Sequence, residues 1–224
     1  MIPVGGDLFG ATSEPIQIGP GAFLLRGFAL TESDALLQQI ESVAQQAPFR
    51  HQITPGGHTM SAAMTNCGEL GWVTDTSGYR YSRLDPMTGQ PWPALPALVL
   101  DVAQRAASTA GYSGFAPQAC LINRYVTGAR MGLHQDKDEQ DLDAPIVSIS
   151  LGAPMHFQFG GLTRQDRYVR WQLDHGDVVV WGGESRLYYH GVAPLGKNAA
   201  HPVSGSVRYN ITLRRVYPTQ SAST

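Results

Sequence analysis

The sequence is short of charged residues and of cysteine, and each shortage excludes a class of protein. Asp, Glu, Lys and Arg make up 15% of the 224 residues, below the ~25% typical of soluble domains. The net charge of −2 argues against a protein that coats nucleic acid through general electrostatics. The two cysteines, Cys67 and Cys120, cannot form a disulfide framework or a zinc ribbon. We therefore expect two buried free thiols.

Long apolar runs are also missing. No run reaches the ~18 residues that span a bilayer. Residues 1–21 contain no Lys or Arg followed by an apolar block, as a secretory signal requires. The hydrophobic fraction of 42% is ordinary for a folded protein, which excludes disorder, collagen and coiled coil as the main architecture. We expect a cytoplasmic protein without membrane contact.

Two segments have the spacing of amphipathic helices. The first begins near Thr31 or Ser33, either of which could cap it. Its apolar residues at helical spacing are Leu36, Leu37, Ile40, Val43 and Ala44. The second begins near Pro93, ends by Gly111, and has an apolar face of Leu95, Leu98, Val99, Val102 and Ala106.

Short apolar runs separated by Gly, Pro and Asp replace this pattern after residue 118. The predicted strands are 119–126, 146–151, 155–159, 169–173, 177–181, 187–192 and 207–214. Because no helical pattern intervenes, we predict an antiparallel sandwich rather than parallel βαβ units. Residues 50–93 lack a clear period, so we expect loops and hairpins there, as in many functional segments. The expected fold class is mainly β with flanking helices.

The first chemical signal is the pair His134 and Asp136. Side chains two apart on an extended segment point the same way, so both could bind one ion. With a distant histidine they would form the facial set of two histidines and one carboxylate found in non-haem Fe(II) oxygenases. Alternatively, both are solvated residues that open a charged loop. A second such pair, His175 and Asp177, flanks a glycine and is interpreted as a turn into a buried strand.

The third ligand has three candidates, His156, His190 and His201. His190 is favoured because it lies in a strand-like run, where Gly191 allows close approach. His156, between apolar neighbours, could equally be a hydrogen-bonded core histidine, and His201 lies in a polar loop.

The strand predicted at 207–214 has one polar face, formed by Arg208, Asn210, Thr212 and Arg214. Two arginines facing inward need anions, and a dicarboxylate would satisfy the two guanidinium groups. Six residues place Arg208 and Arg214 roughly 20 Å apart along the strand, so one should contact a small ligand less directly. Asn123 and Tyr125 add neutral donors on another strand. The alternative is an edge strand whose polar face lies in water.

Taken together, these segments resemble the AlkB family of 2-oxoglutarate- and Fe(II)-dependent dioxygenases, in order, from about residue 20 to 215. The blocks that carry the resemblance are 121–125, 134–138, 176–186, His190 and 208–214. The resemblance implies a double-stranded β-helix (jelly-roll) core that uses Fe(II), 2-oxoglutarate and O2. It implies iron ligands His134, Asp136 and His190, and co-substrate residues Asn123, Tyr125, Arg208, Asn210 and Arg214.

The resemblance also implies a substrate. It would be an N-alkylated base of the 1-methyladenine or 3-methylcytosine type in single- or double-stranded DNA, with RNA left open, and the products would include formaldehyde and succinate. Trp72 would sandwich the base against His134, while Tyr79 and Tyr81 would contact its backbone and the base. The alternative is that these aromatic residues simply pack under a loop.

Two charged residues complete the implied substrate site. The carboxylate of Asp138 would favour a positively charged base over its neutral parent, and Arg164 would be a further contact. Asp141 and Asp143 are expected to be solvated.

The expected organisation is one domain in a chain that acts as a monomer. Residues 1–20 form an N-terminal extension, 21–216 the dioxygenase domain with a nucleotide-recognition lid at 48–93, and 217–224 a flexible tail. One alternative is an oxygenase with the same core that hydroxylates a small molecule or a protein side chain. The other is a cupin-like metal-binding module without catalysis, which would not need Arg208 and Arg214.

Overall fold

The computed structural model describes residues 14–218, so most of the predicted N-terminal extension and C-terminal tail lies outside the described residues. The helices are α1 (Ser33–Gln46) and α2 (Ala97–Thr109), with a 3₁₀ turn at Gly183–Ser185. The strands are β1 (Ile16–Gly19), β2 (Ala22–Leu25), β3 (Arg50–Ile53), β4 (Thr59–Gly68), β5 (Gly71–Asp75), β6 (Gly78–Ser82), β7 (Ala119–Tyr125), β8 (Met131–His134), β9 (Ile146–Gly152), β10 (Met155–Phe159), β11 (Val169–Leu173), β12 (Val178–Trp181), β13 (His190–Val192) and β14 (Arg208–Arg214).

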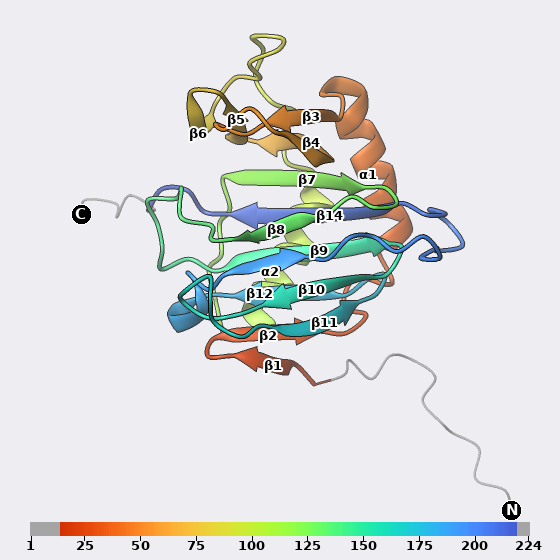
Figure 1. Ribbon diagram of the computed structural model, residues 1–224, viewed down its shortest axis with the longest axis vertical. Coiled ribbons are helices and arrows are strands. Elements are labelled where there is room, and N and C mark those ends of the chain that lie inside the picture. Colours follow the sequence, from red (N-terminus) through yellow and green to blue (C-terminus); the bar gives the residue numbers. More distant parts are fainter. Residues whose placement is uncertain (1–13, 219–224) are drawn as a thin grey trace, which may run out of the picture.

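The strands form two facing sheets and a separate hairpin (Figure 1). The large sheet has the order β1-β2-β12-β9-β14-β7-β4-β3, the small sheet β11-β10-β13-β8, and β5 pairs with β6. Strand neighbours in these sheets are antiparallel. This confirms the predicted fold class, mainly β with flanking helices and a jelly-roll core.

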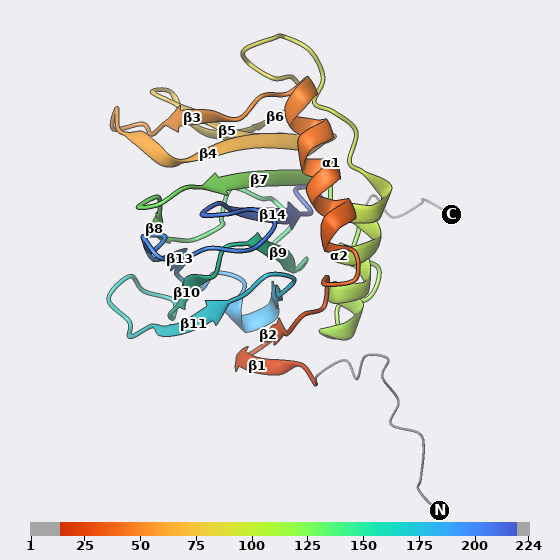
Figure 2. The ribbon, with the colours of Figure 1, turned by 90° about the vertical axis from the view of Figure 1, so that its right-hand side faces the viewer.

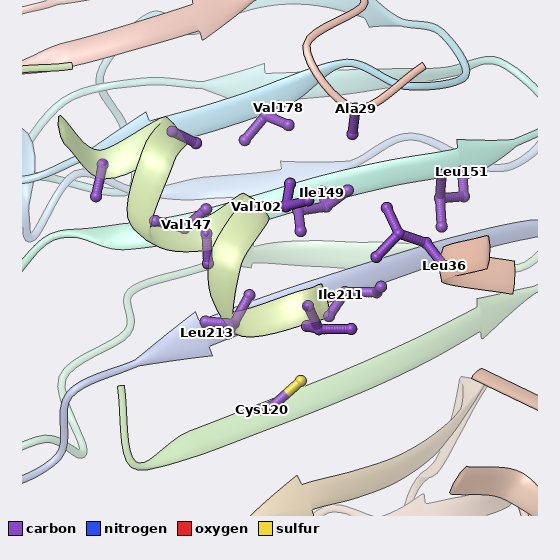
Figure 3. Close-up of a cluster of buried hydrophobic side chains, with 14 of the residues drawn as sticks. Ala29, Leu36, Val102, Cys120, Val147, Ile149, Leu151, Val178, Ile211 and Leu213 are labelled. Carbon is purple, nitrogen blue, oxygen red and sulfur yellow. The ribbon is translucent and has the colours of Figure 1, made fainter. Parts of the chain in front are cut away.

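Both helices cover the outer face of the large sheet, and the functional side chains therefore lie on its inner face (Figures 2 and 3). The predicted helical spacing of the first helix is confirmed, because α1 buries Leu36, Ile40 and Val43 against this sheet. The predicted cap is wrong, because no side chain caps α1. The second helix begins at Ala97 rather than near Pro93, because Pro96 restricts the residue before it to extended backbone. No helix in the described part of the chain combines the length and apolar character that crossing a bilayer would require.

Strand β4 is the largest element that the sequence did not predict. It lies between β7 and β3, and Ala62 to Cys67 are all buried, so it lacks the alternation of a half-exposed strand. The other strands of 50–93 do form hairpins, as expected. Cys67 pairs directly with Cys120 of β7, and both are buried free thiols, as predicted.

Candidate active site

Three of the predicted ligands meet where the small sheet faces the large one. His134 ends β8 and lies directly opposite His190, the first residue of β13. Asp136 follows two residues later, and one ligand atom from each residue lies within 4.8 Å of the others. His134 Nε2 is 3.6 Å from Asp136 Oδ1, and His190 Nε2 is 3.7 Å from Asp136 Oδ2. The structure thus brings His190 to the His-x-Asp pair, whereas His156 is exposed and His201 stacks on His175.

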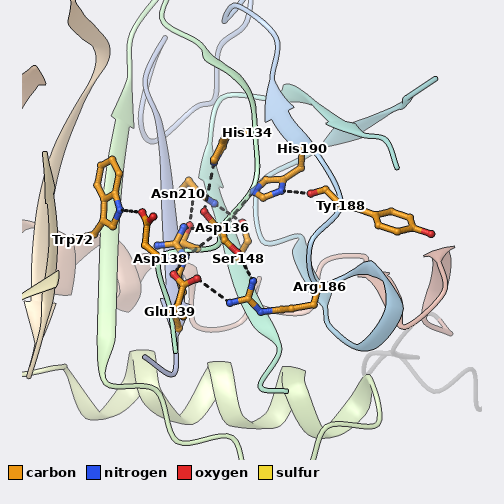
Figure 4. A network of polar contacts seen from close by, with 12 residues as sticks. Trp72, His134, Asp136, Asp138, Glu139, Ser148, Arg186, Tyr188, His190 and Asn210 are labelled. Atoms are coloured by element: carbon orange, nitrogen blue, oxygen red, sulfur yellow. Dashed lines mark hydrogen bonds and ion pairs between the residues drawn. The ribbon is translucent and has the colours of Figure 1, made fainter. Parts of the chain in front are cut away.

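Hydrogen bonds fix which nitrogen of each imidazole faces this centre. Nδ1 of His134 is 2.9 Å from the Gly132 carbonyl oxygen, and Nδ1 of His190 is 3.0 Å from that of Tyr188 (Figure 4). A carbonyl only accepts, so each Nδ1 carries a proton, and in the neutral imidazole Nε2 then presents a lone pair. Burial, the largest cause, lowers the pKa of His190 to about 4. His190 is therefore neutral at pH 7.

Asp136 supplies the negative charge of the centre. Its Oδ2 accepts hydrogen bonds from Nε and Nη2 of Arg214, at 2.9 and 2.7 Å. Burial alone would raise the pKa of Asp136, but Arg214, His190 and His134 outweigh it and hold the pKa well below its usual range. Nε2 of both imidazoles and the carboxylate of Asp136 therefore converge on one centre, where neutral His190 presents a lone pair. This donor set fits Fe(II), because a cation offsets the repulsion and the facial arrangement leaves positions for other ligands.

A buried ion pair, which the sequence did not reveal, supports this centre. Arg186, 2% exposed, donates from Nη1 to the carbonyl oxygen of Asp136 at 2.6 Å and from Nη2 to Glu139 Oε2 at 3.0 Å. Its Nε donates to the carbonyl oxygen of Ala144. The guanidinium thus ties the backbone of a metal-ligand candidate to the segment that follows it (Figure 4).

The acidic segment around Glu139 is not the solvated loop that the sequence suggested. Glu139 and Asp141 are buried, and Asp141 Oδ2 accepts a hydrogen bond from Arg215 Nε at 2.5 Å. The prediction of a solvated Asp141 is therefore wrong, whereas Asp143 is exposed as expected. Arginines distant in the sequence supply the counter-charges, and no local spacing reveals them.

We expect Arg186→Met to weaken metal binding, because the Asp136 carbonyl loses its donor; outer contacts of this kind change metal affinity about 10–100-fold. Calorimetric titration of the protein with Fe(II) under anaerobic conditions measures the loss. Arg215→Met is the matched control, since Arg215 pairs with Asp141 and not with Asp136. The double variant Arg186→Met/Glu139→Gln removes both buried charges and leaves neither unpaired. It therefore distinguishes a loss of metal binding from a loss of folding. Normal metal affinity in both Arg186 variants would refute this role.

The predicted co-substrate residues line the same cavity, which has a volume of about 320 Å³. On β14, Arg208, Asn210, Thr212 and Arg214 face the cavity, while Ile211 and Leu213 pack toward the helices. Asn123 of β7 lies opposite Asn210, and Tyr125 opposite Arg208. The polar row of β14 is therefore an inner surface and not an edge in water.

Arg208 carries a buried positive charge without a carboxylate partner among the described residues. It is 1% exposed, and its Nη2 donates to Ser150 Oγ at 2.7 Å. Its Nε has no partner, and neither has Oδ1 of Asn123. Burial lowers the pKa of Arg208 to about 10 and raises that of Tyr125 to about 12, so at neutral pH Arg208 is charged and Tyr125 is a neutral donor. The donors among these groups, the Arg208 guanidinium and the Tyr125 hydroxyl, fit one carboxylate of a dicarboxylic acid.

Arg214 differs from Arg208 because Asp136 already engages its guanidinium. It lies at the other end of the polar row and contacts the metal-ligand candidate directly. Both arginines line the cavity, and which of them reaches a small ligand less directly stays a prediction.

The predicted substrate residues divide into those that line the cavity and one that does not. Trp72 of β5 stacks on Tyr79 of β6, with ring centroids 5.5 Å apart, and its indole N–H donates to Asp138 Oδ2 at 2.9 Å. These three residues and Arg164 line the cavity. Tyr81 is outside the lining; its hydroxyl donates to Glu139. It lies two residues beyond Tyr79, about 7 Å along the strand, where it reaches the buried segment instead.

Comparisons with known proteins agree with this geometry. The family described as the 2OG-Fe(II) oxygenase superfamily matches residues 21–214. The alpha-ketoglutarate-dependent dioxygenase AlkB of Escherichia coli is 58% identical over 211 residues, which cover 93% of this chain and 97% of that protein. The DNA N(6)-methyladenine demethylase ALKBH1C of Arabidopsis thaliana is 32% identical over 153 residues, covering 60% of this chain and 33% of that protein. The solved structure of OsALKBH1 superposes with a TM-score of 0.79 at 25% identity, covering 90% of this chain and 99% of that one.

Proposed function

Because this chain belongs to the AlkB family of the 2OG-Fe(II) oxygenase superfamily, we propose that it removes alkyl groups oxidatively from N-alkylated nucleic-acid bases. Its family fixes the class of enzyme, an α-ketoglutarate-dependent dioxygenase that uses Fe(II), 2-oxoglutarate and O2. Fe(II), when bound with the co-substrate and O2, supplies the oxidation of the N-alkyl carbon, and a methyl group leaves as formaldehyde while 2-oxoglutarate becomes succinate and CO2. Membership of this family of enzymes also argues against the alternative of a cupin-like metal-binding module without catalysis.

His134, Asp136 and His190 would hold the metal, since their lone pairs converge. Arg208, Asn210, Asn123 and Tyr125 would hold the co-substrate, with Arg214 linking it to Asp136. The chain's own residues would thus orient the metal and the co-substrate and keep the site enclosed between the sheets.

The observation that carries the choice of substrate is the wall formed by Trp72 and Asp138. Trp72 offers a flat surface at the cavity that also contains His134, and stacking on such a surface is available to every base. Asp138 places a carboxylate beside that surface, held there by the indole N–H. Methylation at N1 of adenine or N3 of cytosine gives the base a positive charge, so this carboxylate favours the damaged base. Tyr79 and Arg164 would contact the rest of the nucleotide.

We expect Trp72→Ala to raise the KM for a methylated oligonucleotide by about 5- to 150-fold, since a stacked base is worth roughly 1–3 kcal/mol. Oligonucleotide-independent consumption of 2-oxoglutarate should persist, because the metal and co-substrate residues are untouched. Trp72→Phe keeps a stacking ring but loses the bond to Asp138, so it should lie between the two. Steady-state assays of formaldehyde and succinate measure both quantities; an unchanged KM would place Trp72 in structural packing.

The main alternative keeps the same metal and co-substrate site but acts on a small molecule or a protein side chain. Incubation of 1-methyladenine and 3-methylcytosine oligonucleotides with Fe(II), ascorbate and 2-oxoglutarate, followed by mass spectrometry, tests the proposal directly. Single strands and weakened pairs should react first, because flipping a base costs a few kcal/mol. The same assay with DNA and RNA oligonucleotides of matched sequence compares the rates of demethylation of the two nucleic acids. Absence of demethylation, with turnover of a small molecule, would favour the alternative.

The proposal includes the organisation of the chain. Residues 21–216 would act as one dioxygenase domain, with 48–93 as the lid, in a monomer located in the cytoplasm. The inner walls of the cavity support a single-chain enzyme, because each predicted ligand comes from this chain. Sedimentation of the active protein tests the monomer.

A further inference from the structure

Nearly half of the basic side chains of this protein form ion pairs with carboxylates, and three of those that do not lie close together in the sequence. Of the sixteen Lys and Arg residues, seven form ion pairs with carboxylates in the described chain. Among the nine that form no ion pair there, Arg164 and Arg167 lie in the loop between β10 and β11, and Arg170 is the second residue of β11. The low net charge of the chain makes such a local excess of positive charge the feature that an anionic partner would meet.

This loop joins β10 to β11, and residues 162–170 are all exposed. Its one acid, Asp166, folds back on the loop: its carboxylate accepts hydrogen bonds from the backbone N–H and the hydroxyl of Thr163, at 2.9 and 2.8 Å. Gly161 permits this turn, because a Cβ there would lie 2.4 Å from Asp166 Oδ2. Asp166 thus shapes the loop, and no ion pair joins it to Arg167 or Arg170 in the described structure.

The loop has a fixed position beside the cavity. Arg164 donates to the carbonyl oxygen of Leu133 on β8, and its guanidinium lies 5.0 Å from the ring centroid of Tyr189. Arg164 lines the cavity together with Trp72. Figures 1 and 2 place β5 and β6 at one end of the stack of strands and β10 and β11 toward the other, with β8 between them. The cavity therefore has the lid on one side and the basic loop on the other.

Tyr168 orients the outermost arginine. The Arg170 guanidinium lies 5.7 Å from the ring centroid of Tyr168, and Arg170 Nη2 donates to the Tyr168 hydroxyl at 3.3 Å. Arg167 has no hydrogen bond or ion pair recorded in the described structure. Both guanidinium groups remain exposed, each with free donors that match the oxygens of a phosphate.

We propose that Arg167 and Arg170 contact phosphates of the nucleic-acid strand whose base enters the cavity. This inference rests on the proposed function, and it assigns the side of the cavity opposite the lid as the second contact surface for that strand. The strand would pass over the cavity with its alkylated base turned inward. Phosphate contacts of this kind position a strand without reading its sequence.

The test measures binding of a fluorescent single-stranded oligonucleotide carrying 1-methyladenine to the full chain with Fe(II) and 2-oxoglutarate, without O2, at 50 to 400 mM salt. Two lost contacts should reduce the slope of log affinity against log salt by about 1.4 in Arg167→Ala/Arg170→Ala, and the affinity about 10-fold or more at the lowest salt. The KM for 2-oxoglutarate should not change. Arg105→Ala, on the helical face and paired with Glu32 and Asp101, is the control and should bind normally.

The possible results of this binding test lead to different conclusions. A double variant that binds with the affinity and salt slope of the unmodified protein overturns the inference and leaves the proposed function intact. An unmodified protein that binds no oligonucleotide at any salt overturns both. A loss confined to binding of an acidic peptide, with normal oligonucleotide affinity, would assign the loop to a protein partner and also overturn the inference.

Discussion

Asp136→Ala should abolish turnover, with a loss of at least about 1000-fold, which corresponds to roughly 4 kcal/mol in the activation barrier. Asp136 contributes the only carboxylate of the three converging ligands, and its removal leaves two neutral imidazoles to hold a divalent cation. Succinate and formaldehyde release measure turnover, and anaerobic Fe(II) titration measures metal binding. Turnover close to that of the unmodified protein would refute the assignment.

The same substitution should also destabilise the fold, for a separate reason. The buried guanidinium of Arg214 would lose the partner of its two shortest bonds and keep only the 3.5 Å contact with Glu139. Breaking a buried pair in this way costs about 3–5 kcal/mol. Asp136→Ala/Arg214→Met removes both charges, so it should recover much of the stability and none of the activity. Asp143→Ala, an exposed acid of the same segment, should behave like the unmodified protein.

The sequence predicted best those parts of the site that lie on regular strands. Alternation alone placed Arg208 and Asn210 on one face of β14, because side chains of a strand alternate whatever the surroundings, and the structure turns that face toward the cavity. The residues favoured His190 among three histidines for the third ligand but left the other two open, since that choice depends on the pairing of β13 with β8. The family resemblance singled out His190, which is the one that the structure brings to the centre.

The parts that the sequence did not predict depend on contacts between distant segments. In the sequence, Glu139 is one of several acids in a charged segment. Only the fold brings Arg186 within 3.0 Å of it. Tyr81 shares its strand face with Tyr79, and only the position of Glu139 shows that it is turned away from the cavity lining. Strand β4 was hidden for a related reason: burial of both faces removes the alternation that marks a strand.

Arg208→Met should weaken 2-oxoglutarate binding by about 30- to 5000-fold, since truncating a buried charged partner costs roughly 2–5 kcal/mol of binding energy. The stability of the protein without co-substrate, in contrast, should stay the same or rise. Without the co-substrate, Arg208 is a buried charge whose only close polar contacts are Ser150 Oγ and, at 3.5 Å, the Leu173 carbonyl oxygen. Replacing such a charge by an apolar side chain of similar length removes its desolvation cost and is often neutral or stabilising.

The two effects therefore separate a co-substrate role from a structural one. A structural arginine would lower the Tm when replaced, whereas here the Tm without co-substrate should stay the same or rise. In the unmodified protein, 2-oxoglutarate at 100 times its Kd should add about 2.7 kcal/mol to stability, and this gain should fall below about 1 kcal/mol in Arg208→Met at the same concentration. Arg124→Met is the matched control, because Arg124 lies on the neighbouring strand with its guanidinium over Phe49, away from the cavity lining. A variant that binds 2-oxoglutarate normally, or that unfolds at a much lower temperature, would show that Arg208 serves the fold and not the co-substrate.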